Sequence, residues 1–418
     1  MATPKLVIRP GNPDFLDLPW DKPVSEWESD RLVDMPTGLH RHPVVFVAYR
    51  QGVFAIKELP LRYAASEYEV LRLLEDRTHR AASPAGWVVR PWIDRYSEQG
   101  AAVITKYVRH SFPYRRLISG LGFGARRDHM LDSVASLLVE LHLAGLYWGD
   151  CSLSNLLYRW DAGLIEAIMI DGETSTLHQE LTTGQRREDL EIMIENVAGE
   201  MADIAASSDA DIDRADLALG EDIAERYEAL WEELTESLVI GSDETYLIRQ
   251  RLDRLYALGF AVDDFSLEPT NDGRLVKMSV SVAGRTFHAD RLRHLTGVEA
   301  SENQARVLLG DLSYFRAKKG VKGETEQILA NMEWLSEWFE PLAKRIVVRW
   351  PNEDPVQRYC DFLHHRLQMA RERGHDVDNV EAFEAWMDAG GPGIPADASE
   401  IISLDTDDAT SPRGVRAR

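Results

Sequence analysis

The chain lacks three features that would place it in a familiar class. Only two of its 418 residues are cysteines, Cys151 and Cys360, so it has no disulfide framework and no Cys/His cluster with zinc-finger spacing. No apolar run approaches the ~20 residues that span a bilayer. Residues 1–20 carry prolines and acidic residues where a signal peptide has a long apolar run. We therefore expect a soluble protein of the reducing cytoplasm, with no transmembrane segment.

Basic residues are also scarce. The 47 Lys and Arg residues face 70 Asp and Glu residues, and the net charge of −23 argues against a main task in binding nucleic acid or anionic lipid. Much of the excess lies in residues 181–245, which hold 19 acidic and 4 basic side chains. This stretch is either a solvated helix surface or an electrostatic docking site for a basic protein partner.

Apolar residues are abundant enough to exclude global disorder. They make up 44% of the chain, with 11 Trp, 12 Phe and 13 Tyr, and the length predicts two or three folding units. Composition divides the chain into six regions. They are an extended N-terminal arm (1–30), a small antiparallel β lobe (31–108), a helical lobe (109–205), an acidic linker with a helix (206–244), a mainly helical C-terminal domain with a β-hairpin (245–390) and a disordered tail (391–418).

Periodicity predicts the main elements. Arg50-Gln51-Gly52 separates two runs rich in β-branched and aromatic residues, 44–49 and 53–59, which indicates a hairpin. Helical spacing of apolar residues follows over 64–74 and again over 129–144. A second hairpin is expected over 156–170, and a third in the C-terminal domain, where 275–282 would pair with 285–288.

One constellation carries chemistry. Lys57 ends an apolar strand, and Glu67 on the following helix is a candidate partner, because a buried lysine is costly unless it is paired. Far downstream, Asn155 stands five residues after Asp150, and Asp171 follows 21 residues after Asp150 at the end of another strand. Phosphoryl transfer needs these groups: an amine for phosphate oxygens, oxygen ligands for Mg²⁺, and a carboxylate that orients the attacking hydroxyl.

Over roughly residues 30–205 the sequence resembles the protein-kinase-like superfamily. The matching motifs are the strand Phe54-Ala55-Ile56-Lys57, the loop from Leu141 through Gly145 and Asp150 to Asn155, and the aspartate at the D-F-G position. The resemblance implies a bilobal α+β fold. It also implies that Lys57 contacts the α- and β-phosphates of ATP with Glu67 as its partner, that Asp150 is the catalytic carboxylate, and that Asn155 and Asp171 bind Mg²⁺.

The same resemblance places the adenine site. Residues 103–108 are similar to the strand and hinge that receive adenine through backbone groups, which makes Lys106 and Val108 candidate binding residues, and Leu157 would lie beneath the ring.

The chain also departs from the family pattern. The glycine-rich loop is missing, since residues 36–43 contain one glycine, and His40, Arg41 or His42 could supply positive charge to the phosphates instead. Trp148-Gly149-Asp150 occupies the position of the H-R-D triplet, so the arginine that would bind a phosphorylated activation loop is absent. D-F-G reads Asp171-Gly172-Glu173, and no A-P-E motif precedes Asp189, which could brace the catalytic loop.

These departures are similar to aminoglycoside phosphotransferases, RIO-type atypical kinases and lipopolysaccharide core-sugar kinases. The long C-terminal extension resembles an actinobacterial family labelled lipopolysaccharide-kinase-like, a label that identifies no substrate. The first hypothesis is an ATP- and Mg²⁺-dependent phosphotransferase whose acceptor is a hydroxyl of a small molecule or sugar more than of a protein. The alternatives are a pseudokinase scaffold, with or without nucleotide, whose C-terminal domain recruits a partner, and a slow ATPase switch.

Overall fold

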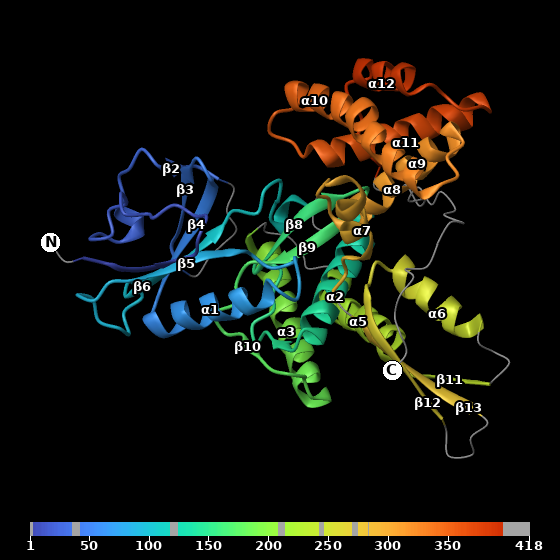
Figure 1. Ribbon diagram of the computed structural model, residues 1–418. Coiled ribbons are helices and arrows are strands. Elements are labelled where there is room, and N and C mark those ends of the chain that lie inside the picture. Colours follow the sequence, from blue (N-terminus) through green and yellow to red (C-terminus); the bar gives the residue numbers. More distant parts are fainter. Residues whose placement is uncertain are drawn as a thin grey trace. The chain divides into compact units, whose positions relative to one another are not determined.

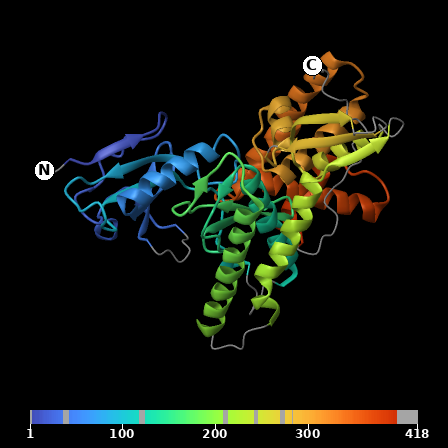
Figure 2. The same cartoon turned by 90° about the horizontal axis from the view of Figure 1, so that it is seen from below.

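A computed structural model describes residues 3–35, 42–117, 124–207, 214–241, 246–269, 275–282 and 284–395. The chain forms two compact units (Figures 1 and 2). The first comprises residues 1–159 and 165–285, and the second comprises 160–164 and 286–418. Residues 246–285 therefore lie in the first unit, although composition grouped them with the C-terminal domain.

The first unit begins with a six-stranded antiparallel sheet in the order β1-β5-β6-β4-β3-β2. Its strands are β1 (Lys5–Ile8), β2 (Leu32–Val33), β3 (Val44–Tyr49), β4 (Gly52–Leu59), β5 (Pro84–Val89) and β6 (Ala101–Lys106). The predicted first hairpin is β3–β4, which pairs Val44 with Lys57 and Tyr49 with Gly52. Residues 3–8 of the expected N-terminal arm add strand β1 to the edge beside β5.

Apolar side chains cover both faces of this sheet. On one face Phe15, Trp20 and Trp27 of the N-terminal arm form a buried cluster with strand residues, including Phe54 and Ile56. On the other face helix α1 (Leu61–Leu74) packs against the sheet through Ala64. The helix runs below the strands in Figure 1. Because both faces are buried, the strand residues between them are held rigidly.

Helices and short hairpins complete the first unit. The helices are α2 (Arg127–Leu143), α3 (Thr183–Ser207), α4 (Arg214–Leu217), α5 (Leu219–Thr235) and α6 (Tyr246–Ala257). Two small sheets pair β7 (Leu146–Tyr147) with β10 (Thr176–Leu177) and β8 (Leu156–Asp161) with β9 (Leu164–Met169). A six-stranded antiparallel sheet followed mainly by helices confirms the expected α+β class.

The prediction for the third hairpin was wrong. Strand β13 (Leu275–Val282) pairs with β12 (Val262–Pro269) on one side and β11 (Leu238–Gly241) on the other. Phe287 and His288, expected in a strand, begin helix α7 (Phe287–Thr296). Glu302 accepts hydrogen bonds from the backbone amides of His288 and Ala289, which satisfies two of the free donors at that helix start.

The second unit is helical. After α7 come α8 (Glu302–Lys319), α9 (Glu324–Glu333), a π-helical turn (Trp334–Phe339), α10 (Glu340–Arg349), α11 (Pro355–Arg373) and α12 (Asn379–Asp388). Its core is rich in buried aromatic rings, among them Trp334, Tyr359, Phe362, Phe383 and Trp386. In the part of the chain that the structure describes, no helix combines the length and apolarity needed to cross a bilayer.

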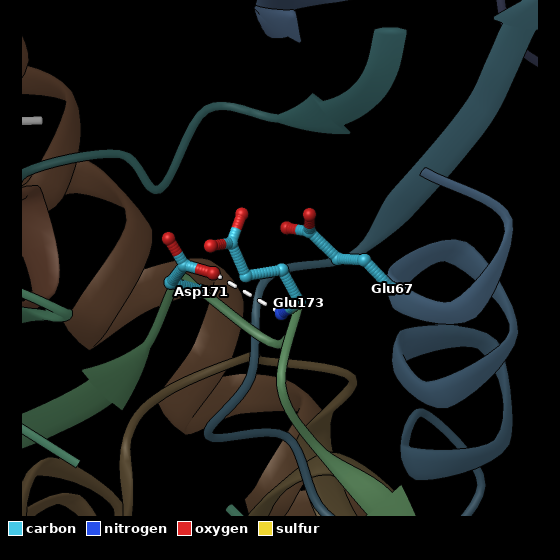
Figure 3. Close-up of side chains that lie close together, drawn as sticks. All are labelled: Glu67, Asp171 and Glu173. Carbon is cyan, nitrogen blue, oxygen red and sulfur yellow. Dashed lines mark hydrogen bonds between the residues drawn. The ribbon is translucent and has the colours of Figure 1, made fainter. Parts of the chain in front are cut away.

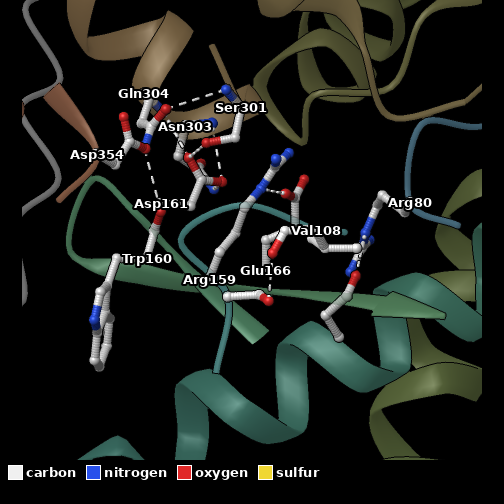
Figure 4. Close-up of polar contacts among 12 residues, drawn as sticks. Arg80, Val108, Arg159, Trp160, Asp161, Glu166, Ser301, Asn303, Gln304 and Asp354 are labelled. Atoms are coloured by element: carbon white, nitrogen blue, oxygen red, sulfur yellow. Dashed lines mark hydrogen bonds and ion pairs between the residues drawn. The ribbon is translucent and has the colours of Figure 1, made fainter. Parts of the chain in front are cut away.

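The second unit also contains the tip of the β8–β9 hairpin. Asp161 is fully buried there and accepts hydrogen bonds from Ser301 Oγ, from the backbone amides of Asn303 and Gln304, and from Asn303 Nδ2, at 2.6–3.2 Å (Figure 4). Its carboxylate therefore caps the N-terminus of α8 from more than a hundred residues away.

Candidate functional site

The first unit contains a pocket that opens to solvent, and about 710 Å³ of space, part of it open solvent, lies among its lining atoms. Its apolar walls include Val44, Phe46, Ala55 and Val103. Most of the predicted site residues line it: Lys57, Glu67, Lys106, Val108, Asn155, Leu157 and Asp171. The structure therefore gathers residues from the sheet, from α1 and from the β8–β9 hairpin around one space. Asp150 does not belong to this lining.

Lys57 is the central cation of the site. Its Nζ lies 2.8 Å from Glu67 Oε2, 3.0 Å from Asp171 Oδ1 and 3.8 Å from Glu173 Oε2. Burial by itself lowers the pKa of Lys57, but the carboxylates of Glu67 and Asp171 raise that pKa on balance. Burial raises the pKa of Glu67 to about 7, against the lowering effect of Lys57. The expected Lys57–Glu67 ion pair is thus present, and the amine keeps its charge.

Three carboxylates surround this amine. Ligand oxygens of Glu67, Asp171 and Glu173 lie within 4.8 Å of one another, a spacing at which they could share a cation (Figure 3). Asp171 Oδ1 also accepts a hydrogen bond from the Glu173 backbone amide at 3.2 Å, which turns the Asp171-Gly172-Glu173 segment back on itself. Sequence reasoning noted Glu173 only as a departure from D-F-G, yet an acidic residue two positions after a metal-ligand candidate was a usable signal.

Asp150 and Asn155 occupy the loop between β7 and β8. Asn155 Nδ2 donates to the backbone carbonyl of Asp150 at 2.8 Å, which closes the loop and turns the carboxamide oxygen away from that carbonyl. Burial, opposed by a hydrogen bond from Asn196, raises the pKa of Asp150, and the nearby charge of Asp171 raises it further. The Asn155 side chain therefore holds the backbone of Asp150 in place within one short loop.

Asp189 braces this loop, as the sequence suggested. It is fully buried, and its carboxylate accepts the backbone amides of Trp148 and Gly149 at 2.7 and 2.8 Å. His142 Nε2 lies 3.1 Å from the same carboxylate, and its Nδ1 lies 2.8 Å from Tyr227 Oη. His142 is thus a buried residue that helps to hold the loop from α2.

Two further residues on α3 contact the loop and were missed. Asn196 contacts Asp150 and Cys151, and Glu200 accepts the backbone amides of Leu153 and Ser154 at 2.8 and 2.9 Å. On an acidic helix such residues look like solvated surface. The signal was their spacing of seven and eleven residues from Asp189, which places them on the same line along the helix.

The loop that was expected to cover the phosphates is described only in part. His40 and Arg41, the predicted phosphate-binding candidates, lie outside the described residues. His42 is buried, with Nδ1 3.0 Å from Glu98 and Nε2 3.1 Å from Glu173. The hydrogen bond to Glu173 raises the pKa of His42, so this environment favours the protonated imidazole beside the Asp171-Gly172-Glu173 segment.

Comparisons with known proteins identify one family region and several structural likenesses. A family model described as "Domain of unknown function (DUF4032)" matches residues 229–390, which extend from α5 of the first unit through α12 of the second. No curated protein matches the chain.

Two solved structures illustrate the structural likeness. "WaaP in complex with acyl carrier protein" shares 15% sequence identity and a TM-score of 0.32, and the match covers 53% of this chain and 88% of that chain. "Crystal structure of Rad53 kinase domain and SCD2" shares 11% identity and a TM-score of 0.30, with 48% and 71% covered.

Proposed function

We propose that the protein is a phosphotransferase of the atypical kinase type, which transfers the γ-phosphoryl group of ATP to a hydroxyl acceptor. One observation carries the proposal. The Lys57 ammonium contacts Glu67 on one side and Asp171 on the other, in the wall of a cavity whose remaining lining is largely apolar. The apolar part of the cavity is suited to a flat base, and the part beside Lys57 is suited to phosphates.

The apolar part of the cavity suits an adenine ring. Val44, Phe46 and Ala55 contribute one side of the lining and Leu157 contributes to the rest. Lys106 and Val108 belong to the lining where strand β6 ends, so their backbone groups are candidates for the base edge. Planar apolar ligands gain affinity from such walls because apolar surface is removed from water.

The donor set at the other end fits Mg²⁺. Asp171 and Glu173 offer carboxylate oxygens and Asn155 offers a carboxamide oxygen, the ligand types that Mg²⁺ prefers. When bound, the ion would neutralise phosphate charge and polarise the transferring group. The chain itself supplies the Lys57 ammonium and the His42 imidazole beside these acids.

Asp150 is the proposed orienting base. It accepts the proton of the acceptor hydroxyl while the new bond forms between the hydroxyl oxygen and the γ-phosphorus. The bond from the γ-phosphorus to the β,γ-bridging oxygen breaks, and ADP leaves with that electron pair. The raised pKa of Asp150, caused first by burial, favours a carboxylate that can hold this proton.

The segment after Asp171 favours an acceptor other than a regulated protein substrate. Thr174 Oγ1 donates to the Trp148 carbonyl at 2.9 Å, and the His178 amide donates to the Gly145 carbonyl at 2.8 Å. Strand β10 then pairs with β7. These contacts hold the segment beside the catalytic loop without a phosphate group and without the arginine that would bind one, so we favour a small-molecule or sugar hydroxyl.

The test uses purified full-length protein, Mg-ATP and a panel of hydroxyl acceptors. We expect acceptor-dependent ADP release by the wild-type protein and its loss in Asp150→Ala, with Mg-ATP binding retained. Thermal unfolding supplies the binding measurement, because ligand at ~100 times its Kd adds about 2.7 kcal/mol to stability. Full activity of Asp150→Ala would contradict the proposed base.

The same measurement tests the nucleotide site. Lys57→Met should lose most of the Mg-ATP stabilisation, because the amine that faces the phosphates is gone. A wild-type protein that gains no stability from millimolar Mg-ATP would contradict the phosphotransferase and leave the scaffold alternative. Binding without turnover across the acceptor panel would favour the scaffold as well.

A further inference from the structure

Helix α3 presents three polar side chains in one line. Asp189, Asn196 and Glu200 are separated by seven and four residues, and at 3.6 residues per turn they deviate from a common line by only about 20°. They span about 16 Å of helix at 1.5 Å per residue. Buried apolar residues such as Met193 and Val197 flank them, so this line faces the interior of the first unit.

The catalytic loop runs along this line in the same direction as the helix. Asp189 binds the amides of Trp148 and Gly149 at the start of the loop, and Glu200 binds the amides of Leu153 and Ser154 near its end. Asn196 stands between them. Asp189 and Glu200 therefore fix the backbone on both sides of Asp150, and Asn196 donates to its carboxylate.

The Asn196 amide is itself fixed in orientation. Its Nδ2 lies 3.0 Å from Asp150 Oδ1 and 3.1 Å from the Cys151 carbonyl oxygen. Both neighbours are acceptors only, so the amide nitrogen must face them, and each of its two hydrogens has one partner. A flipped amide would place its oxygen against two other oxygens, and the network therefore assigns the nitrogen to this side.

We propose that Asn196 is a positioning residue for phosphoryl transfer: by occupying Oδ1 of Asp150 it holds the carboxylate in one rotamer and presents Oδ2 to the acceptor hydroxyl. The inference rests on the proposed function, because it assigns a partner to the proposed base. It replaces regulated ordering with a fixed contact, since the hydrogen bond comes from helix α3, which packs on the first unit through residues such as Met193 and Val197, and not from a segment that phosphorylation would order. The catalytic carboxylate is then ready for reaction in the unmodified protein.

The test compares three variants on α3 in the full-length protein. Asn196→Ala removes both donors, Asn196→Asp keeps the size and replaces the donors with a second carboxylate, and Glu195→Ala changes the exposed neighbour as the matched control. The probes are Mg-ATP, whose Kd is measured by calorimetry, and ADP release in water and with the same acceptor panel, which gives kcat and KM for Mg-ATP.

We expect kcat to fall about tenfold in Asn196→Ala and further in Asn196→Asp, while KM and Kd for Mg-ATP change less than about twofold. Glu195→Ala should match the wild type. A role in packing alone gives the opposite order, because the isosteric Asp would be tolerated better than Ala. Unchanged kcat in Asn196→Ala, or equal losses in kcat and Mg-ATP affinity, overturns the proposal.

Failure of the proposed function is seen separately. If the wild-type protein releases no ADP with water or with any acceptor of the panel, or if Asp150→Ala is fully active, the phosphotransferase itself is refuted. The crystal structure of Asn196→Ala then still decides whether Asn196 sets the carboxylate: we expect the Asp150 side chain to leave its present rotamer. An unchanged Asp150 side chain in that variant overturns the proposal in either case.

Discussion

Two aspartates that flank the same strand show how partners decide what a carboxylate does. Asp161 ends β8 at the hairpin tip and Asp171 follows β9 at the hairpin base. Asp161 is 0% exposed and is surrounded by hydrogen-bond donors at the start of α8. The Asp171 side chain is 23% exposed, contacts the Lys57 ammonium and lines the cavity.

The difference separates a fold role from a chemical role. Every donor to Asp161 is a protein group whose position is already set by α8, so this carboxylate has no capacity left for a ligand. The partner of Asp171 is a cation that a nucleotide phosphate could share, and its remaining surface faces the cavity. Burial alone therefore does not mark the functional aspartate, whereas an ionic partner beside an open space does.

The largest effect is expected from a substitution at the base of the β8–β9 hairpin, at Asp171. Asp171→Asn keeps the size of the side chain and removes the charge that would hold Mg²⁺. We expect ADP release to fall more than about a hundredfold, because loss of several kcal/mol of transition-state stabilisation has that effect on rate. Asp21→Asn, at an exposed position, is the control and should leave the rate unchanged. An Asp171→Asn variant with near wild-type turnover contradicts the metal role.

The next largest effect is expected from a substitution at the hairpin tip, at Asp161. Asp161→Ala leaves Ser301 and the first turn of α8 without their acceptor, and we expect about 3 kcal/mol of lost stability in the second unit, since buried unsatisfied groups cost about 1–3 kcal/mol each. Amide hydrogen exchange in α8 measures this loss. Asp388→Ala, at an exposed residue of the same unit, should change little.

The Asp161→Ala variant also tests whether the two ends of the hairpin act independently. The hairpin base has its own backbone hydrogen bonds, from Ile170 to Asn155, from Met169 to Arg80 and from Ala82 to Met169. We therefore expect the Mg-ATP affinity of Asp161→Ala to stay within about threefold of the wild type. A larger loss of affinity would show that the two ends of the hairpin are coupled.

These two aspartates also show how far the sequence leads. Lys57, Glu67 and Asp171 were predicted from their places at strand ends and on the following helix, together with a resemblance to a kinase-like motif. The structure joins them by direct contacts. Asp161 was predicted only as part of the hairpin over 156–170, because its partners lie beyond residue 300 and no local pattern indicates them. Local patterns describe local structure, and long-range hydrogen bonds leave little trace in them.

The same limit explains the remaining differences. Asn196 and Glu200 lie on an acidic helix whose composition suggests solvent exposure, and only their contacts with the loop between β7 and β8 show that they face inward. Phe287 and His288 follow a true strand and were assigned to its hairpin. They form a helix because Glu302, from another helix, accepts the amides of His288 and Ala289 at its start.

A smaller effect is expected at Gly163, beside Asp161 in the tip. It has φ +91°, and an added Cβ would lie 2.8 Å from Ile394 Cγ2. Gly374 has φ +71° with open space around it, so it is the matched control. Both changes to Ala should cost about 1 kcal/mol for the left-handed backbone, and Gly163→Ala about 1 kcal/mol more because Ile394 must shift. Denaturant unfolding followed by tryptophan fluorescence measures the difference, and equal losses would argue against a packed tip.

The smallest expected effect is a pH dependence of the free energy of unfolding, caused by Asp361, which contacts the residue that holds the tip. Gln357 Oε1 accepts the Ala162 amide, and Gln357 Nε2 donates to Asp361 at 2.9 Å, so Asp361 supports the group that holds the tip. Burial raises the pKa of Asp361, although Gln357 and Arg358 oppose that rise. In the pH interval just above the ordinary aspartate pKa, the folded chain then binds more protons at this site than the unfolded chain. The contribution of Asp361 to the free energy of unfolding must therefore fall as pH increases through that interval. Asp361→Asn removes the titration and keeps an acceptor oxygen, and we expect a flatter pH profile of unfolding than in the wild type. A profile that keeps its slope in the variant would assign the dependence to other carboxylates.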